Sequence, residues 1–150
     1  MKVILGSDHA GYLAKTALVA ALKKAGHSVI DAGTDSPDSV DYPDFAAQVA
    51  NAVASADAER GVLVCGTGIG MSMAANKVHG ARAAVVTNEF TAEMSRRHND
   101  ANIICLGARV LPAEKMEEYV RIFLATPFEG GRHTGRVDKI MKLEEKKESF

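Results

Sequence analysis

The chain has 150 residues, of which 47% are hydrophobic and 25% charged, and this length suits one globular domain with a substantial core. Its net charge is −1 and its basic residues are spread among the acids, so no basic face indicates nucleic-acid binding. The apolar start at residues 3–5 is too short for a signal peptide or a membrane span. Two cysteines without an export signal argue against a disulfide framework. The sequence therefore predicts one cytoplasmic domain over residues 1–150, with no nucleic-acid or membrane partner.

Strand-like and helix-like segments alternate along the whole chain. Short apolar runs predict strands at 3–6, 29–32, 62–65, 83–87 and 103–106. Helical periodicity predicts helices at 12–25, from 43 onward, at 71–76, 89–97 and 112–125, and a last one at about 133–147. This alternation is typical of a three-layer α/β/α sandwich around a five-stranded parallel sheet, a Rossmann-like arrangement.

Polar residues follow two of the predicted strands. Ser7, Asp8 and His9 come after the first strand, and Cys65 ends the third. In an open α/β sheet, ligands bind outside the carboxyl ends of the strands, where the strand order reverses. If the first and third strands are neighbours, these residues share one crevice.

A glycine-rich turn follows Cys65, with glycines at 66, 68 and 70. The spacing does not fit a dinucleotide-binding fingerprint, which requires glycine where Met71 stands, and no Gly-Lys-Ser/Thr sequence follows. The turn is either a nest of N–H groups for an oxyanion or only a tight strand-to-helix connection. A thiol beside it has its thiolate favoured, although free cysteines are commonly buried and inert. Cys105, which has no such turn after it, is assigned to the core.

The pair Asp8-His9 has the groups needed to bind sugar hydroxyls or transfer protons, or it is a helix cap with an incidental histidine. His98, at the end of a predicted helix, either complements the helix dipole or acts as an acid toward a ring oxygen. No set of potential ligands has convincing metal spacing, so we expect no metal.

Arg132 and Arg136 lie four residues apart at the start of the last predicted helix, so their guanidinium groups share a face. Such a pair suits a phosphate dianion, and Arg109 is a third candidate; the alternative is a solvated cationic helix face. His133, between the two arginines, is expected to be exposed with them.

Taken together, these segments closely resemble the type B ribose-5-phosphate isomerases, within the wider ribose/galactose isomerase family. The resemblance covers nearly the whole chain. Its motifs are GSDHAGY at 6–12, VDYPDFA at 40–46, CGTGIGMSMAANK at 65–77, SRRHNDANI at 95–103 and EGGRHTGRV at 129–137.

The resemblance implies a cofactor-free aldose–ketose isomerase that interconverts ribose 5-phosphate and ribulose 5-phosphate through an enediolate. It implies that Cys65 moves the proton between C1 and C2. It also implies that His98 assists ring opening, together with the Asp8 side and Thr67. The resemblance further implies that one loop stabilises the enediolate oxygen, and this loop comprises Gly66, Thr67, Gly68, Ile69 and Gly70.

For the rest of the substrate, the resemblance implies contacts from Tyr42 and Asn99. The phosphate is implied to bind His9, Arg132 and Arg136, with Arg109 a plausible addition. The family forms homodimers with shared active sites, and a dimer of dimers also occurs; its first strand lies between the second and third. Some relatives use a glutamate just after the glycine loop as the base, but this chain has Met71 there, so Cys65 inherits the role.

Two other functions stay open from the sequence. One is isomerisation of a six-carbon sugar phosphate, such as allose 6-phosphate or galactose 6-phosphate. The other is a non-catalytic domain that binds sugar phosphates with the same nest and arginines.

Overall fold

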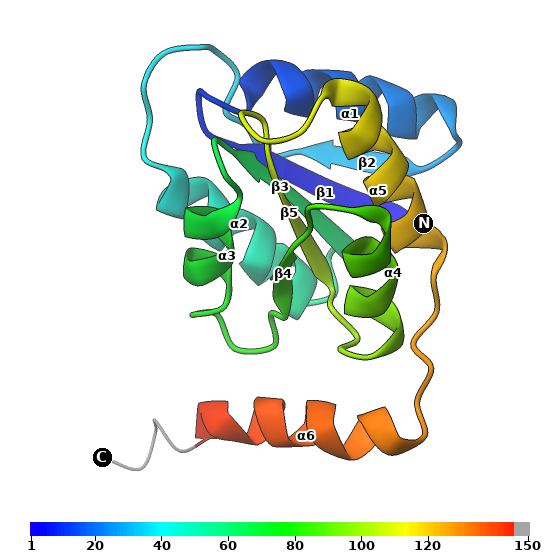
Figure 1. The fold of residues 1–150 in the computed structure, drawn as a ribbon. Coiled ribbons are helices and arrows are strands. Elements are labelled where there is room, and N and C mark those ends of the chain that lie inside the picture. The colour runs from blue at the N-terminus through cyan, green and yellow to red at the C-terminus, as the bar shows by residue number, and fades with distance from the viewer. Residues whose placement is uncertain (146–150) are drawn as a thin grey trace.

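The computed structural model describes residues 1–145 and shows a three-layer sandwich, with one sheet between two layers of helices (Figure 1). The sheet has five parallel strands in the order β2-β1-β3-β5-β4. The fold class, the five strands and the place of the first strand between the second and third are confirmed. The strands are β1 (Lys2–Ser7), β2 (Ser28–Asp31), β3 (Arg60–Cys65), β4 (Ala83–Val85) and β5 (Ile103–Gly107).

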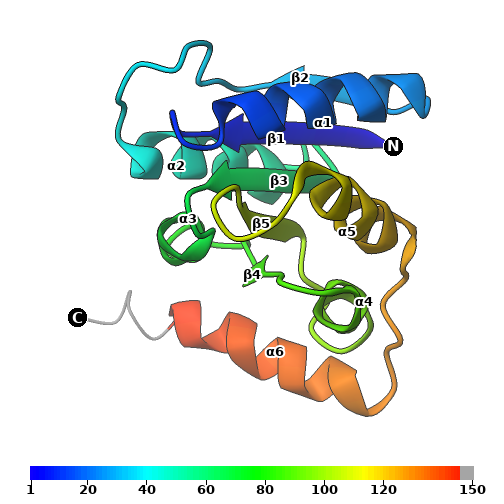
Figure 2. The ribbon, with the colours of Figure 1, turned by 45° about the horizontal axis from the view of Figure 1, so that its top comes forward.

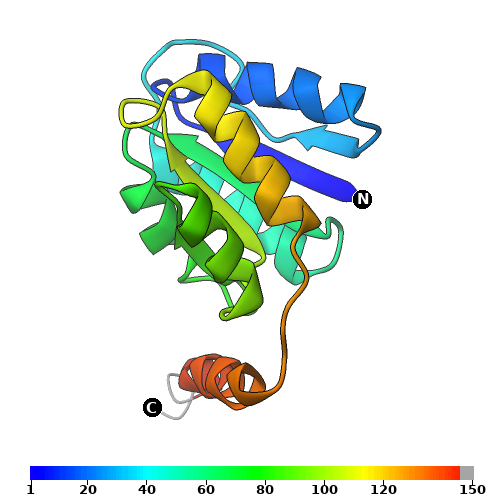
Figure 3. The same cartoon turned by 45° about the vertical axis from the view of Figure 1, so that its right-hand side comes forward.

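Two apolar clusters hold the layers together, one on each face of the sheet. Alternate residues of a strand point to opposite faces, so Val62 packs on one side and Leu63 on the other. Helices α1, α4 and α5 cover the Val62 face, and α2 and α3 cover the Leu63 face; Figure 3 shows α4 and α5 in front of the sheet. The helices are α1 (Tyr12–Lys24), α2 (Tyr42–Ala54), α3 (Ile69–Ala75), α4 (Glu89–Arg97), α5 (Ala113–Ala125) and α6 (Arg132–Glu145).

Most element boundaries lie within one residue of the sequence prediction, β3 begins two residues earlier than predicted, and two other differences have local causes. Helix α3 begins at Ile69, before the expected 71, because Gly68 takes a left-handed conformation (φ +82°) and caps it. Strand β4 ends at Val85, because the N–H groups of Thr87 and Asn88 turn instead to the hydroxyl of Thr91 in a capping box.

Helix α6 stands apart from the sandwich. Figure 2 shows it beyond the β4 edge of the sheet, reached by an extended connection from α5. Only His133 and Val137 are buried along its length, whereas the apolar side chains of Ile140 and Leu143 are 46% and 59% exposed. Positions 146 and 147 of the predicted helix lie outside the described residues. Over residues 1–145, none of the helices combines the length and apolar character that a membrane span requires.

Candidate active site

The polar ends of β1 and β3 lie side by side, as the sequence predicts. The two strands pair directly, with Ser7 in register with Val64, and the Asp8 N–H donates to the Val64 carbonyl at 3.3 Å. A carboxylate oxygen of Asp8 accepts the N–H of Gly11 at 3.0 Å, which fixes the turn into α1. Gly11 lies so close to the Val64 carbonyl that a side chain there would collide with it. Asp8 and Cys65 therefore meet where the strand order reverses, the usual ligand position in an open α/β sheet.

The glycine loop turns main-chain donors toward the Cys65 thiol. The side chain of Cys65 is 5% exposed at the end of β3, and its Sγ accepts the N–H of Gly68 at 3.1 Å. The N–H of Ile69 bonds the hydroxyl of Thr67 at 3.2 Å, which holds the loop in one conformation. Further N–H groups of the first turn of α3, such as that of Gly70, have no helical acceptor. The loop thus provides hydrogen-bond donors for negative charge at or beside the thiol.

Strand β5 fixes the other side of this loop. The N–H of Ala108 donates to the Cys65 carbonyl at 2.8 Å, and that of Arg109 donates to the Gly66 carbonyl at 3.0 Å. The Arg109 guanidinium lies over Gly66, where an added Cβ would be 3.2 Å from its Nη1. The Thr67 backbone lies against Gly107, where an added Cβ would be 2.8 Å from it. The loop is therefore held from beneath by a buried strand.

His9 and Tyr42 complete this side of the site. Nδ1 of His9 accepts the N–H of Val40 at 3.2 Å, which places the proton of a neutral ring on Nε2 and leaves that donor for a ligand. The ring of Tyr42, at the start of α2, packs on Gly70, where a Cβ would be 2.6 Å from it. Ten predicted residues thus gather at this edge, the strand-end group: Asp8, His9, Tyr42, Cys65, Gly66, Thr67, Gly68, Ile69, Gly70 and Arg109.

The other four predicted site residues lie at the opposite edge of the sheet. Helix α4 runs back from the end of β4, so His98 and Asn99 follow it near the beginning of β5. There the Asn102 carbonyl accepts the N–H of Gly61, at the beginning of β3. Cys65 is four residues further along β3, about 13 Å away at about 3.3 Å per residue. One subunit therefore does not bring His98 to Cys65.

Arg132 and Arg136 accompany His98 at this second edge. The rings of His98 and His133 stack at a centroid distance of 4.2 Å with their planes 13° apart. Both arginines are exposed at the start of α6, on either side of His133. These residues, with Asn99, form the α6-edge group.

The prediction that His133 is exposed is wrong. Its ring is 4% exposed, because it packs beneath the His98 ring instead of following its arginine neighbours into solvent. Burial lowers the pKa of His133, and the neighbouring His98, Arg132 and Arg136 lower it further. Helical spacing alone does not reveal this burial, since the covering ring belongs to His98, the residue after α4.

Sequence spacing also missed a possible metal-ligand set. Donor atoms of His98, Glu129 and His133 lie within 4.8 Å of one another. Glu129 and His133 are four residues apart, but Glu129 and the two glycines after it precede α6, so helical spacing does not pair them. His98 joins them only through the fold.

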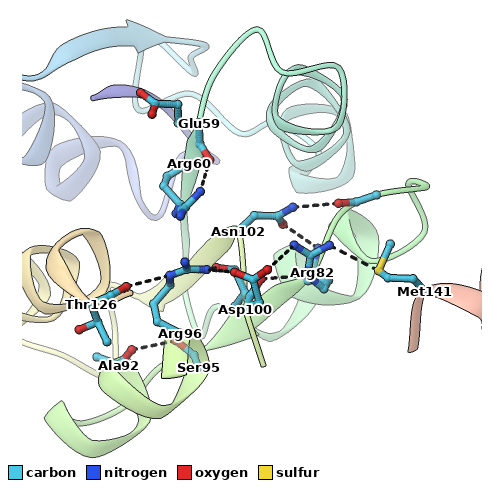
Figure 4. Close-up of polar contacts among 12 residues, drawn as sticks. Glu59, Arg60, Arg82, Ala92, Ser95, Arg96, Asp100, Asn102, Thr126 and Met141 are labelled. Carbon is cyan, nitrogen blue, oxygen red and sulfur yellow. Dashed lines mark hydrogen bonds and ion pairs between the residues drawn. The ribbon is translucent and has the colours of Figure 1, made fainter. Parts of the chain in front are cut away.

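An aspartate with two arginines fixes the loop that carries His98 (Figure 4). Nη1 of Arg96 donates to Asp100 at 2.7 Å and to the Ala101 carbonyl at 2.6 Å. The Asp100 carbonyl accepts Nε of Arg82 at 2.9 Å, and its carboxylate forms a 3.5 Å ion pair with the same guanidinium. The side chain of Arg96 is only 3% exposed, so the loop after α4 is anchored in the protein interior.

A cavity of about 410 Å³ lies between α6 and the β4 edge. Asn99, Arg82 and the exposed apolar residues Ile140 and Leu143 contribute to its lining. None of its lining residues belongs to the strand-end group.

The fold and the strand-end group define a class of protein: an α/β sandwich that presents a thiol and an anion-binding loop to a small ligand at the switch point of a parallel sheet. Comparisons with known proteins identify the family to which the chain belongs. The chain belongs to the ribose/galactose isomerase family, whose model matches residues 3–140.

Similar proteins and structures agree with this placement. The chain is 44% identical to ribose-5-phosphate isomerase B of Escherichia coli over 97% of its own length and 98% of that protein's. A structure of ribose-5-phosphate isomerase B from Clostridium thermocellum matches with a TM-score of 0.97 and 52% identity, over 98% of this chain and 99% of that one. The Mycoplasma genitalium enzyme, solved with bound ribulose-5-phosphate, matches with a TM-score of 0.93 and 42% identity, over 96% of each chain.

Proposed function

We propose that this protein interconverts ribose 5-phosphate and ribulose 5-phosphate, with Cys65 as the base that moves a proton between C1 and C2. The observation that carries this proposal is the strand-end thiol whose Sγ accepts the Gly68 N–H at 3.1 Å inside a loop of further donors. Its relatives from E. coli and C. thermocellum are named ribose-5-phosphate isomerase B. The reaction needs only acid–base chemistry, so the chain's own groups suffice without a cofactor.

The proton transfer follows from this geometry. The Cys65 thiolate removes the proton from C2 of the open-chain aldose, the C2–H electrons form the C1–C2 double bond, and the carbonyl electrons move to O1. The thiol then returns the proton to C1, and the O2 proton passes to O1, so that O1 becomes a hydroxyl group and O2 the new carbonyl oxygen. Loop N–H donors near Gly68 stabilise the transient charge on oxygen, and losing one such donor typically raises the barrier by about 2.7–4 kcal/mol.

We infer that the complete site forms between two copies of the chain. Within one subunit, the strand-end group and the α6-edge group lie on opposite edges of the sheet, with about 13 Å of strand between Cys65 and the edge that carries His98. In a two-fold homodimer, His98 of the partner subunit would open the sugar ring beside Asp8 and Thr67, and Asn99 of the partner subunit would contact the substrate. The exposed Ile140 and Leu143 of α6 supply apolar surface for such an assembly, which a dimer of dimers would repeat.

The phosphate would bind where the two groups meet. Arg132 and Arg136 are exposed and four residues apart on α6, His9 presents a free Nε2, and the exposed Arg109 lies at the mouth of the loop. Charge-assisted hydrogen bonds of this kind contribute about 1.5–3 kcal/mol each. Holding the phosphate positions C1 and C2 over the thiol. We place this reaction in the cytoplasm, where the free Cys65 thiol stays reduced.

The decisive experiment replaces the base. Cys65→Ala is expected to lower kcat by about 10²–10⁴-fold, the range for general acid–base groups, while ribose 5-phosphate still binds by calorimetry. Cys105→Ala is the matched control: it removes a thiol from the same apolar cluster and should lower thermal stability but keep kcat. Near-normal turnover by the Cys65 variant would contradict the assignment.

The family name also covers galactose isomerases, so a six-carbon sugar phosphate is the second candidate. Values of kcat/KM for ribose 5-phosphate, allose 6-phosphate and galactose 6-phosphate, measured side by side, decide between them. We expect the five-carbon sugar to be preferred. Exchange of the C2 proton with deuterated water distinguishes either isomerase from a domain that only binds the sugar.

A further inference from the structure

We propose that His98, Glu129 and His133 form a binding site for a zinc-class divalent cation, and that an ion there withdraws His98 from the reaction. The first half of this proposal concerns binding alone. The second half rests on the proposed role of His98 in ring opening.

One member of the set is fixed and two are free to adjust. His133 is 4% exposed and packed, whereas His98 is half-buried and Glu129 is 45% exposed. The Glu129 carboxylate already lies 3.8 Å from Nε2 of His133. A buried imidazole with two adjustable neighbours is a site that an arriving ion can close.

The distances are near those that a metal requires. Zinc binds nitrogen and carboxylate oxygen at about 2.0–2.2 Å, so ligand atoms in a tetrahedral site lie about 3.4 Å apart. The three donor atoms here lie within 4.8 Å of one another, so each must move by about 1 Å or less. The two rings lie nearly parallel, with their planes 13° apart, so their in-plane lone pairs converge on one ion only after the His98 ring rotates about its χ2.

The donor chemistry selects the class of ion. Two imidazoles and one carboxylate, with a fourth position left for water, is a set typical of zinc and of similar transition metals. Magnesium and calcium prefer oxygen ligands only. The site would therefore bind zinc and similar transition metals in preference to magnesium and calcium.

Two neighbouring arginines should make metal binding at this site reversible. Nε of Arg132 lies 3.4 Å from Nε2 of His133, and Nε of Arg97 lies 3.5 Å from the Glu129 carboxylate. In the first contact, Nε2 of His133 is the acceptor and so carries a lone pair, which is the form of the ring that binds a metal. Both arginines must move away when the ion enters. We therefore expect binding that a chelator reverses readily.

Calorimetry with Zn²⁺ and absorption spectroscopy with Co²⁺ test the binding half on the full chain. Both are done with the Cys65→Ala variant, because the thiol is a competing zinc ligand. We expect one ion per subunit and a Co²⁺ spectrum of nitrogen and oxygen ligands. His133→Gln and Glu129→Gln, each added to that variant, should weaken binding by at least about tenfold. His79→Gln and Glu93→Gln are matched controls, since Glu93 also pairs with Arg97 but lies outside the set.

Zinc inhibition of the wild-type isomerase tests the other half. Inhibition should be reversed by a chelator, and Glu129→Gln should need at least about tenfold more zinc for the same inhibition. Loss of binding in the Cys65→Ala variant would overturn the site itself. Binding without inhibition would overturn the withdrawal of His98. If the zinc-free wild-type protein does not isomerise the sugar, the proposed function fails, while calorimetry still decides the site.

Discussion

The thiols of Cys65 and Cys105 lie in the same apolar cluster, but their surroundings differ in two respects. They occupy different positions along their strands, and only the sulfur of Cys65 is given a hydrogen bond by the glycine loop. Cys105 is fully buried within β5, and burial, together with the nearby Cys65, raises the pKa of its thiol. It therefore remains protonated, which confirms its assignment to the core. Cys65 ends β3, where the Gly68 N–H meets its sulfur. Position in the strand decides which cysteine can carry chemistry.

The buried His133 makes stability depend on pH. Its pKa is lowered in the folded protein, chiefly by burial, so the unfolded chain binds the proton more readily. The stabilising contribution is therefore present above the ordinary histidine value of about 6.5 and is lost as the pH falls below it. We expect the Tm, measured in the presence of a chelator, to decrease between pH 7 and pH 5. His133→Gln should flatten this decrease, and an equal slope in the two proteins would contradict the explanation.

At the scale of elements, the conformation of the glycine loop after β3 depends on the neighbouring strand β5. Gly107 of β5 lies beneath Thr67, and an added Cβ would be 2.8 Å from backbone atoms that cannot move without shifting the loop. We predict that Gly107→Ala lowers kcat by about tenfold or more, because a displacement near 1 Å costs catalytic geometry. KM for ribose 5-phosphate should change less, since most of the proposed phosphate contacts, those of His9, Arg132 and Arg136, lie on other elements. Steady-state kinetics measure both, and an unchanged kcat would show that the loop tolerates the shift.

The connection from α4 to β5 also contributes to stability in a way that sequence patterns do not predict. Asp100 has φ +47° and pairs with Arg96, whose side chain is 3% exposed. Asp100→Ala should lower the free energy of unfolding by about 2–3 kcal/mol, below the usual cost of breaking a buried pair because Asp100 is 32% exposed. Asp100→Asn is the matched variant: it tolerates the left-handed conformation and loses only the charge, so it should be destabilised less. Denaturant unfolding compares the two, and equal stability of Asp100→Ala and the wild type would refute the anchoring role.

At the scale of the whole molecule, the proposed active site requires two copies of the chain, because the two residue groups lie on opposite edges of one sheet. Cys65→Ala and His98→Asn should each be inactive as homodimers, because each site in them lacks one group. After co-refolding, a mixed dimer has one site with both groups intact. Random pairing should therefore restore about a quarter of wild-type activity. If both groups served the same subunit's site, mixing would restore nothing, and the shared-site proposal would fail.

The sequence by itself determined the layer architecture and most of the strand-end group. Apolar runs alternating with periodic helices admit few arrangements, and parallel strands bring residues that follow them, such as Asp8 and Cys65, to one edge. Local chemistry determined the glycine loop as well, because its conformation depends mainly on its own residues.

Only the tertiary structure decided which edge of the sheet His98 occupies and that His133 is buried beneath its ring. It also decided that Glu129 lies beside these two histidines. It also decided that Lys15 is buried, with its ammonium bonded to Asp31 and to the Thr34 carbonyl. The physical reason is the same in each case. Burial and pairing depend on which distant segments pack together, and periodicity within one helix does not contain that information.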